Sequence, residues 1–221
     1  MENSSATFTL MELFRMGGII MWPLLFFSIA TVAITIERAI FLLYHSCKID
    51  DLKEAMTSAI RGGNPGEARE FLESQTRRRM GARVFLALLN RRQTLAPRLS
   101  ERRLEKAVEA EAAASISSLE NGFNLLTTLA SISPLTGFLG TVTGMIAAFR
   151  SIAEAADVNA QIVAGGIYEA LITTVFGLVI AIVAMSAHSI FTNIVDKFAS
   201  ELEIACSDLI IGICETAKHE D

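Results

Sequence analysis

The sequence predicts an all-α polytopic membrane protein with three transmembrane helices, two of which continue into a cytoplasmic helical bundle. Of its 221 residues, 52% are hydrophobic and 19% are charged, whereas about a quarter are charged in an ordinary soluble domain. Three uncharged runs are long enough to cross a hydrocarbon core, which takes about 20 apolar residues in a helix. No segment shows a convincing strand pattern.

The three apolar runs are Gly17–Ile36, Asn121–Phe149 and Ala170–Val195. Helices in the core of soluble proteins rarely stay uncharged over such lengths, so we interpret all three as membrane spans. The first run is not expected to be a cleaved signal peptide, because it lacks a basic n-region and exceeds the usual length of the apolar part.

The distribution of basic residues predicts the orientation. Fourteen of the 19 Lys and Arg residues lie between Lys48 and Lys106, and none lies between Arg150 and Lys197. Because basic loops stay in the cytoplasm, the segment joining the first two spans is expected to be cytoplasmic. Three spans then place the N-terminus in the periplasm and the C-terminus in the cytoplasm.

The predicted order of segments follows from these spans. It comprises an outside N-terminal segment (1–16), the first transmembrane helix (17–44), a cytoplasmic helical region (45–120), the second transmembrane helix (121–150), a short outside loop (151–168), the third transmembrane helix (169–195) and a cytoplasmic C-terminal helix (196–221).

The cytoplasmic region contains start and stop signals for several helices. One helix is expected from Asp50 or Asp51 to Arg61, and the next begins with Asn64 as N-cap and Pro65 in the first turn. A further helix over 81–93 is expected to bury Val84, Phe85, Leu88 and Leu89.

Two longer helices are predicted to reach the membrane. From Ser100 no clear stop is found, so we expect one helix of roughly 75–80 Å as far as Ile152. Its proposed seam consists of Leu104, Val108, Glu111, Ser115, Ser118 and Gly122. The third span is expected to continue to about Cys214 along a heptad seam formed by Phe191, Val195, Phe198, Leu202, Ala205 and Leu209.

The second span contains an unusually small and polar stretch, SPLTGFLGTVTGM at 133–145. On a helix, one stripe would collect Ser133, Gly137, Gly140, Thr141, Gly144 and Ala148. Small residues at this spacing let helix backbones approach closely. The third span has a similar face with Thr174 and Gly177. Two explanations stay open: tight packing with hydroxyls bonded back to their own helix, or a polar-walled cavity for water, ions or a partner helix.

These motifs resemble a known family. SPLTGFLGTVTGMIAAF at 133–149, together with GIYEALITTVFGLVIAI at 166–182, is similar to the MotA/TolQ/ExbB proton-channel family and closest to its three-span ExbB and TolQ branch. The resemblance implies a homopentameric ring in the inner membrane of Gram-negative bacteria, enclosing the helices of a dimeric ExbD- or TolR-like partner. It also implies a motor driven by the proton motive force, with a TonB-like protein as a further partner in an ExbB-like role.

The resemblance assigns roles to individual residues. Thr141 and Thr174 match the pore threonines, Glu169 matches the acid of the third span, and Pro134 matches the motif proline. The protonatable aspartate of the family sits on the partner chain, which agrees with the absence of an acid inside any span. Helix packing is assigned to Gly137, Gly140, Gly144 and Gly177.

Several residues leave alternatives open. Val183 stands near the place where many relatives carry a proline, and His188 is expected to serve packing or the interface more than a proton relay. Glu169 also suits the first turn of a helix without any pore role. The sequence does not separate ExbB-like transport energisation, which we favour, from a TolQ-like or gliding motor or from a non-conducting scaffold. It also does not show whether the driving ion is a proton or sodium.

An enzyme is not expected. The sequence offers no nucleophile–base set, no phosphate-binding loop and no metal cluster, so we expect neither a cofactor nor a metal, and no nucleic-acid partner. The three cysteines, Cys47, Cys206 and Cys214, have no ligand spacing and are interpreted as small apolar residues on the cytoplasmic side.

Overall fold

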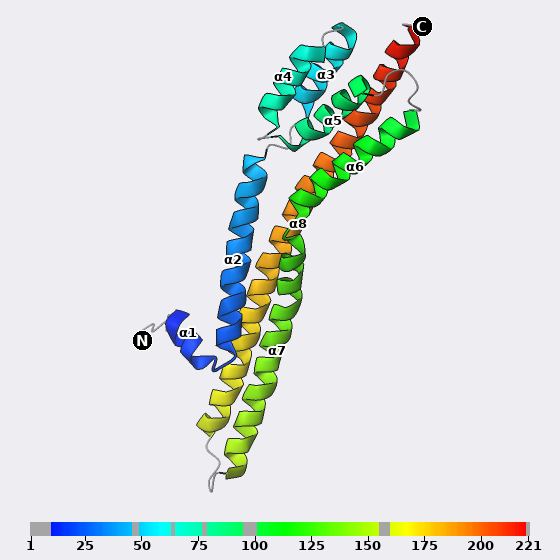
Figure 1. The fold of residues 1–221 in the computed structure, drawn as a ribbon. Helices are drawn as coiled ribbons and strands as arrows, with labels where there is room; N and C mark the ends of the chain where they lie inside the picture. Colours follow the sequence, from blue (N-terminus) through cyan, green and yellow to red (C-terminus); the bar gives the residue numbers. More distant parts are fainter. Residues whose placement is uncertain are drawn as a thin grey trace, which may run out of the picture. The chain divides into compact units, whose positions relative to one another are not determined.

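The structure is a computed structural model that describes residues 10–45, 49–62, 65–76, 79–94, 101–154 and 160–219. All regular elements in these ranges are helices (Figure 1). They are α1 (Leu10–Met16), α2 (Met21–Tyr44), α3 (Asp50–Gly62), α4 (Pro65–Gln75), α5 (Met80–Thr94), α6 (Glu101–Glu120), α7 (Phe123–Glu154) and α8 (Ala160–His219). The all-α prediction is confirmed. Asn64, the predicted N-cap of α4, lies outside the described residues.

Three helices are long and apolar enough to cross a membrane, as predicted. They are α2 with 24 residues, α7 with 32, and the part of α8 from Ala164 to Gly212. Helix also extends further into the predicted 151–168 loop than expected, because α7 continues to Glu154 and α8 already begins at Ala160.

The prediction of one uninterrupted helix from Ser100 to Ile152 is wrong. Gly122 separates α6 from α7 with a φ of 89°, a left-handed conformation that glycine adopts without steric penalty. Its carbonyl accepts hydrogen bonds from the N–H groups of Leu125 (3.1 Å) and Leu126 (3.4 Å), which starts α7. The second span is therefore a separate helix, and α8 is the helix that runs on without a break.

The chain divides into two compact units, and α8 contributes to both. The first unit combines the described parts of Met1–Glu37 with Gly122–Ser189. The second combines those of Arg38–Asn121 and Ile190–Asp221.

The second unit packs α3 to α6 with the C-terminal part of α8. All six residues of the predicted α8 seam, from Phe191 to Leu209, are at most 7% exposed, and the predicted face of α5 is buried as well. An exposed ion pair joins Lys53 Nζ of α3 to Asp208 Oδ2 of α8 at 2.7 Å. Burial raises the pKa of the Cys206 thiol to about 12, so this thiol stays protonated at neutral pH.

The predicted seam of α6 needs a correction. Val108 and Ser115 are buried, but Glu111 and Ser118 are exposed and Leu119 is buried instead. A straight helix with 3.6 residues per turn drifts away from a strict seven-residue repeat, which accounts for the shift from Ser118 to Leu119. The side chain of Leu104 lies outside the described ones.

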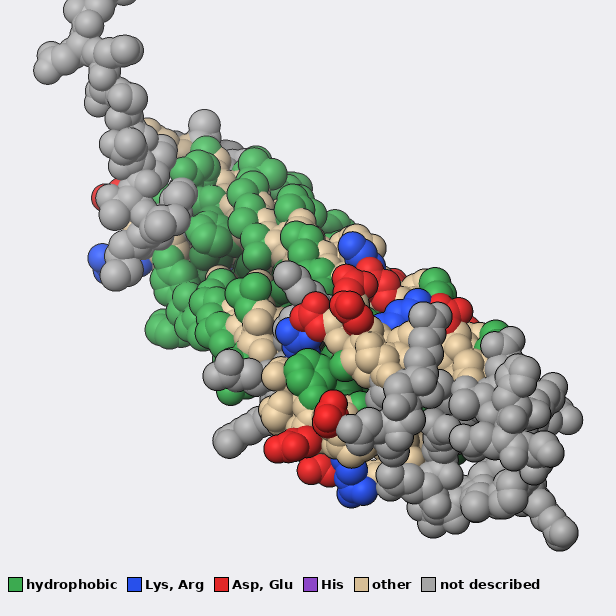
Figure 2. Space-filling model, turned by 90° about the horizontal axis from the view of Figure 1, so that it is seen from above, with side chains coloured by type: hydrophobic (Ala, Val, Ile, Leu, Met, Phe, Trp, Pro, Cys, Tyr) green, Lys and Arg blue, Asp and Glu red, His purple; other side chains and the backbone are tan. Residues whose placement is uncertain are grey.

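In the first unit, α2 packs against α8 while the outer surfaces of the spans stay apolar. Met21 and Leu24 form a buried cluster with Ile172 and Ile180. Many large apolar side chains of the spans are exposed, among them Trp22, Phe138 and Ile182. Figure 2 shows hydrophobic side chains gathered in one continuous area on the face it displays. Apolar surface on this scale is unfavourable in water and suits hydrocarbon.

Candidate functional site

The contact between α7 and α8 is made by glycines, and it brings the two backbones together. A Cβ atom added to Gly177 of α8 would lie 2.5 Å from the Ser133 carbonyl oxygen and 3.2 Å from Gly137 Cα. A Cβ added to Gly137 would lie 2.8 Å from the Thr173 carbonyl oxygen. Because the obstructing atoms belong to the backbone, no side-chain rotation can make room for a methyl group at either position.

The same contact continues along both helices in opposite directions. A Cβ on Gly140 would fall on the side chain of Thr173, and one on Gly144 would lie 3.1 Å from the Gly166 carbonyl oxygen. A Cβ on Gly166 would in turn lie 2.6 Å from Ala148 Cβ. The predicted stripe of small residues therefore faces α8 of the same chain, with Thr141 at its edge, half-buried.

Two neighbouring hydroxyls of α8 meet one carbonyl of α7. Thr174 Oγ1 donates to the Gly137 carbonyl at 3.3 Å. Thr173 Oγ1 lies 2.8 Å from the Ala170 carbonyl and 3.3 Å from that of Gly137. Since a helical carbonyl points toward the residue four positions later, these hydroxyls lie beside the turn that leads from Gly137 to Thr141.

Thr173 is part of this contact although the sequence analysis did not single it out. It is 1% exposed, whereas Thr174 is half-buried. Successive residues of a helix point about 100° apart, so only one of two adjacent threonines can face the neighbouring helix fully. Spacing alone gave no signal for the choice, because Thr173 and Thr174 precede Gly177 by four and three residues and both share its face.

Thr141 uses its hydroxyl proton on its own helix. Its Oγ1 donates to the Phe138 carbonyl at 2.7 Å, which leaves the lone pairs of the hydroxyl as its remaining hydrogen-bonding capacity. The longer bond from Thr174 to Gly137 is weaker, so the Thr174 proton is easier to redirect to another acceptor. Thr141 thus offers acceptor lone pairs, whereas Thr174 offers a proton that it can donate.

Pro134 lies inside α7 and changes the backbone bonding one turn earlier. A proline has no N–H to donate, so the Ala130 carbonyl receives no helical hydrogen bond from residue 134. The adjacent Ser133 hydroxyl donates to the Leu129 carbonyl at 2.6 Å. Pro134 therefore removes the usual donor of one carbonyl, whereas the Ser133 hydroxyl adds a donor to the neighbouring one.

Glu169 lies on a different side of α8 from Thr174. Its carboxylate contacts Gly18, which has a φ of 65° in the turn before α2. Thr174 follows Glu169 by five positions on α8, which places the two side chains about 140° apart around the helix. A negative charge near the first turn of α2 is electrostatically favourable. The structure thus brings Thr173 and Thr174 to the Gly137 carbonyl, whereas the Glu169 carboxylate lies at Gly18.

His188, in the middle of α8, packs against the first residue of α7. Its ring meets Phe123 edge-on, with the ring centroids 6.0 Å apart. Its Nδ1 is buried and has no hydrogen-bond partner among the described residues. Across the described ranges, no group of three His, Cys, Asp or Glu side chains is arranged to hold a metal ion.

Comparison with known proteins places this helix pair in a family. The model of the MotA/TolQ/ExbB proton channel family matches residues 76–204. The chain is 34% identical over 180 residues to the putative biopolymer transport protein ExbB-like 3 of Synechocystis sp., covering 80% of this chain and 82% of the relative. It is 34% identical over 176 residues to the Tol-Pal system protein TolQ of Haemophilus influenzae, covering 75% of each.

A third relative matches nearly from end to end. The biopolymer transport protein exbB1 of Vibrio cholerae is 28% identical over 222 residues, which covers 96% of this chain and 92% of the relative. The match with the family model includes the whole contact between Ser133 and Gly177.

Proposed function

Because the chain belongs to the MotA/TolQ/ExbB proton channel family, we propose that it forms the ring of an inner-membrane motor driven by the proton motive force. The family and the three apolar helices make it a multi-pass inner-membrane protein of the transport-energising kind. The proposal rests on two threonines, Thr141 of α7 and Thr174 of α8. Both lie at the same turn of α7, within an uncharged span.

The ring encloses the single-span helices of an ExbD/TolR-like dimer, and we propose five copies of this chain. One chain with three spans cannot surround a helix, so several copies are needed. No Asp or Glu lies between Glu120 and Glu154 or between Glu169 and Asp196. The carboxylate that carries the proton therefore comes from the partner, and this chain supplies the wall of its path.

The threonines give that wall its chemistry. A carboxylate in hydrocarbon is costly in its charged form. Thr174 can turn its proton toward the ionised carboxylate, whereas Thr141 accepts a hydrogen bond from the protonated form or from water. Pro134 leaves the Ala130 carbonyl without its usual helical donor, so this carbonyl can accept a hydrogen bond from water. Glu169 stands at its outer end, where it also contacts Gly18.

The work done by the motor is proposed to be ExbB-like, with a TonB-like protein as the element that acts on the outer membrane. The relatives in Synechocystis sp. and Vibrio cholerae, which are named as biopolymer transport proteins of the ExbB type, support this role. The TolQ relative keeps a TolQ-like or gliding motor as the alternative. A scaffold that conducts no ion is the alternative from another class.

Proton uptake into liposomes separates the motor from the scaffold. With an inside-negative potential, liposomes that hold this chain and an ExbD/TolR-like partner are expected to acidify, while liposomes with either protein alone serve as controls. Native mass spectrometry of the same preparation is expected to give a homo-oligomer of this chain. A stable monomer would contradict the ring, and a proton-tight complex would favour the scaffold.

The proposed orientation has its own test. In a chain whose three cysteines are replaced by alanine, Ala153→Cys is expected to react with an impermeant maleimide added to spheroplasts, because the end of α7 would face the periplasm. Glu73→Cys in α4 is expected to react only after the membrane is opened. Both side chains are exposed in the structure, so accessibility does not bias the comparison. The reverse labelling pattern would invert the topology.

A further inference from the structure

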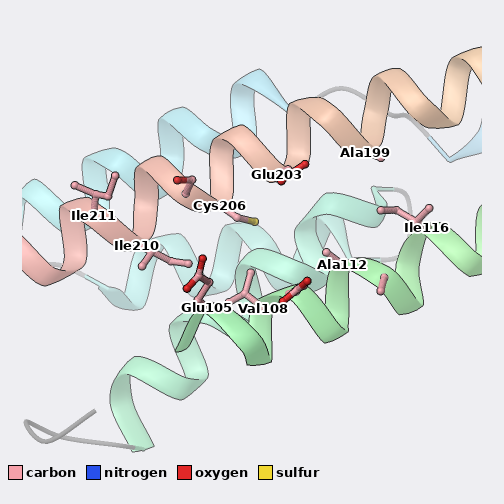
Figure 3. A pocket seen from close by; sticks show the side chains of 12 residues that line it. Glu105, Val108, Ala112, Ile116, Ala199, Glu203, Cys206, Ile210 and Ile211 are labelled. Carbon is pink, nitrogen blue, oxygen red and sulfur yellow. The ribbon is translucent and has the colours of Figure 1, made fainter. Parts of the chain in front are cut away.

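A groove in the second unit lies between α6 and the C-terminal part of α8 (Figure 3). Its volume is about 530 Å³. Apolar side chains that line it include Val108 and Ile116 of α6 and Ile210 of α8. The proton path described above makes no use of this groove.

The groove has the length of a helix. Its lining extends from Glu105 to Ile116 on α6 and from Ala199 to Ile211 on α8, which corresponds to roughly 17 Å or three turns on each helix. In Figure 3, Glu105 lies toward Ile210 and Ile116 toward Ala199, so the two helices run antiparallel. An elongated trough between two helices accepts the apolar ridge of a third.

The charges of the groove are all negative. Glu105 and Glu109 line it from α6 and Glu203 lines it from α8, with no Lys or Arg among the lining residues. In the part of the chain that the structure describes, no ion pair joins any of the three to a basic side chain. A trough lined by apolar side chains and three carboxylates is complementary to an amphipathic helix with Lys or Arg beside its apolar stripe.

We propose that this groove binds a basic amphipathic helix of a partner protein. The same two helices of a second copy are poor occupants, because α6 and the C-terminal part of α8 would bring further acids such as Glu111 and Asp208 against the same carboxylates. The incoming helix places its apolar residues over Val108 and Ile210 and its basic residues opposite the three glutamates.

The proposal is tested with the full-length protein in nanodiscs of zwitterionic phosphatidylcholine. The probe is a fluorescent Leu/Lys peptide of about 18 residues with leucines at helical i, i+3, i+4, i+7 spacing. Its twin carries Glu in place of Lys. The Lys peptide is expected to bind saturably in fluorescence anisotropy, at least about tenfold more tightly than the Glu peptide and than either peptide binds empty nanodiscs.

Two groove variants and one matched control decide the outcome. The triple variant Glu105→Gln, Glu109→Gln, Glu203→Gln is expected to weaken binding about tenfold or more, and Ala113→Trp is expected to block the groove without changing its charge. The control Glu54→Gln, Glu70→Gln, Glu111→Gln removes the same charge from exposed positions outside the groove and is expected to bind normally.

Three results would overturn the proposal. Equal weakening in the control would mean that the peptide follows net charge alone. Unchanged binding in both groove variants would place the peptide elsewhere. A change of homo-oligomer size in the groove variants, measured by native mass spectrometry without peptide, would mean that a second copy of this chain fills the groove.

Discussion

Gly177→Ala is expected to destabilise the protein by about 2–3 kcal/mol, although alanine is the better helix former. The new methyl group would lie 2.5 Å from the Ser133 carbonyl oxygen and 3.2 Å from Gly137 Cα. Because both atoms belong to the backbone of α7, the helices must separate, and overpacking of this kind costs about 1–3 kcal/mol. The bond from Thr174 to the Gly137 carbonyl, already 3.3 Å long, would be lost as well.

Thermal unfolding in detergent measures this effect, with Gly165→Ala as the matched control. A fall in Tm of roughly 5–10 °C is expected for Gly177→Ala. Gly165 lies on the same helix, but a Cβ atom there would have nothing within 4 Å. Its replacement is expected to stabilise the helix slightly, by about 0.5–1 kcal/mol. Equal Tm values for the two variants would show that α7 and α8 are not in backbone contact in the membrane.

Much of the fold could be predicted from the sequence because its helices carry strong local signals. The length of the uncharged runs predicts the spans. The spacing of Phe191, Val195 and Phe198 predicts the buried seam of α8, and the structure confirms that all three side chains are buried. The break at Gly122 was missed because the apolar pattern continues across it. Asn121-Gly122 is a dipeptide typical of turns, but only the left-handed φ of the glycine ends the helix.

The site was less predictable, for a physical reason. Which of Thr173 and Thr174 is buried depends on the rotation of α8 about its axis, and that rotation is set by the contact with Gly137 and Gly140 on another helix. The contact of Glu169 with Gly18 joins residues far apart in the sequence. Spacing along one helix predicts which residues share a face, whereas the identity of the neighbour is a property of the folded unit.

The valine variants of Thr141 and Thr174 are expected to lose most proton-driven function while assembling normally. Valine is nearly isosteric with threonine, so the helix contact survives and only the hydroxyl is lost. Each hydroxyl that stabilises the mobile carboxylate or its water contributes on the order of 1 kcal/mol, or about fivefold in rate. Repetition around a ring multiplies that loss, so proton uptake into liposomes with the partner is expected to fall by much more than fivefold.

The control is Thr128, a threonine of α7 that matches neither pore threonine of the family. Thr128 Oγ1 donates to the Asn124 carbonyl at 2.7 Å, and its side chain is exposed, so Thr128→Val is expected to conduct normally.

Thr173→Val separates packing from conduction. Its buried hydroxyl bonds two carbonyls, so its loss is expected to lower Tm as well as function. Thr141→Val should keep the Tm and oligomer size of the parent. Thr174→Val should keep the oligomer size and lower the Tm less than Thr173→Val, because it loses only the single 3.3 Å bond to the Gly137 carbonyl. Normal proton uptake in both would mean that these hydroxyls satisfy only the backbone of α7 and that the proton path runs elsewhere.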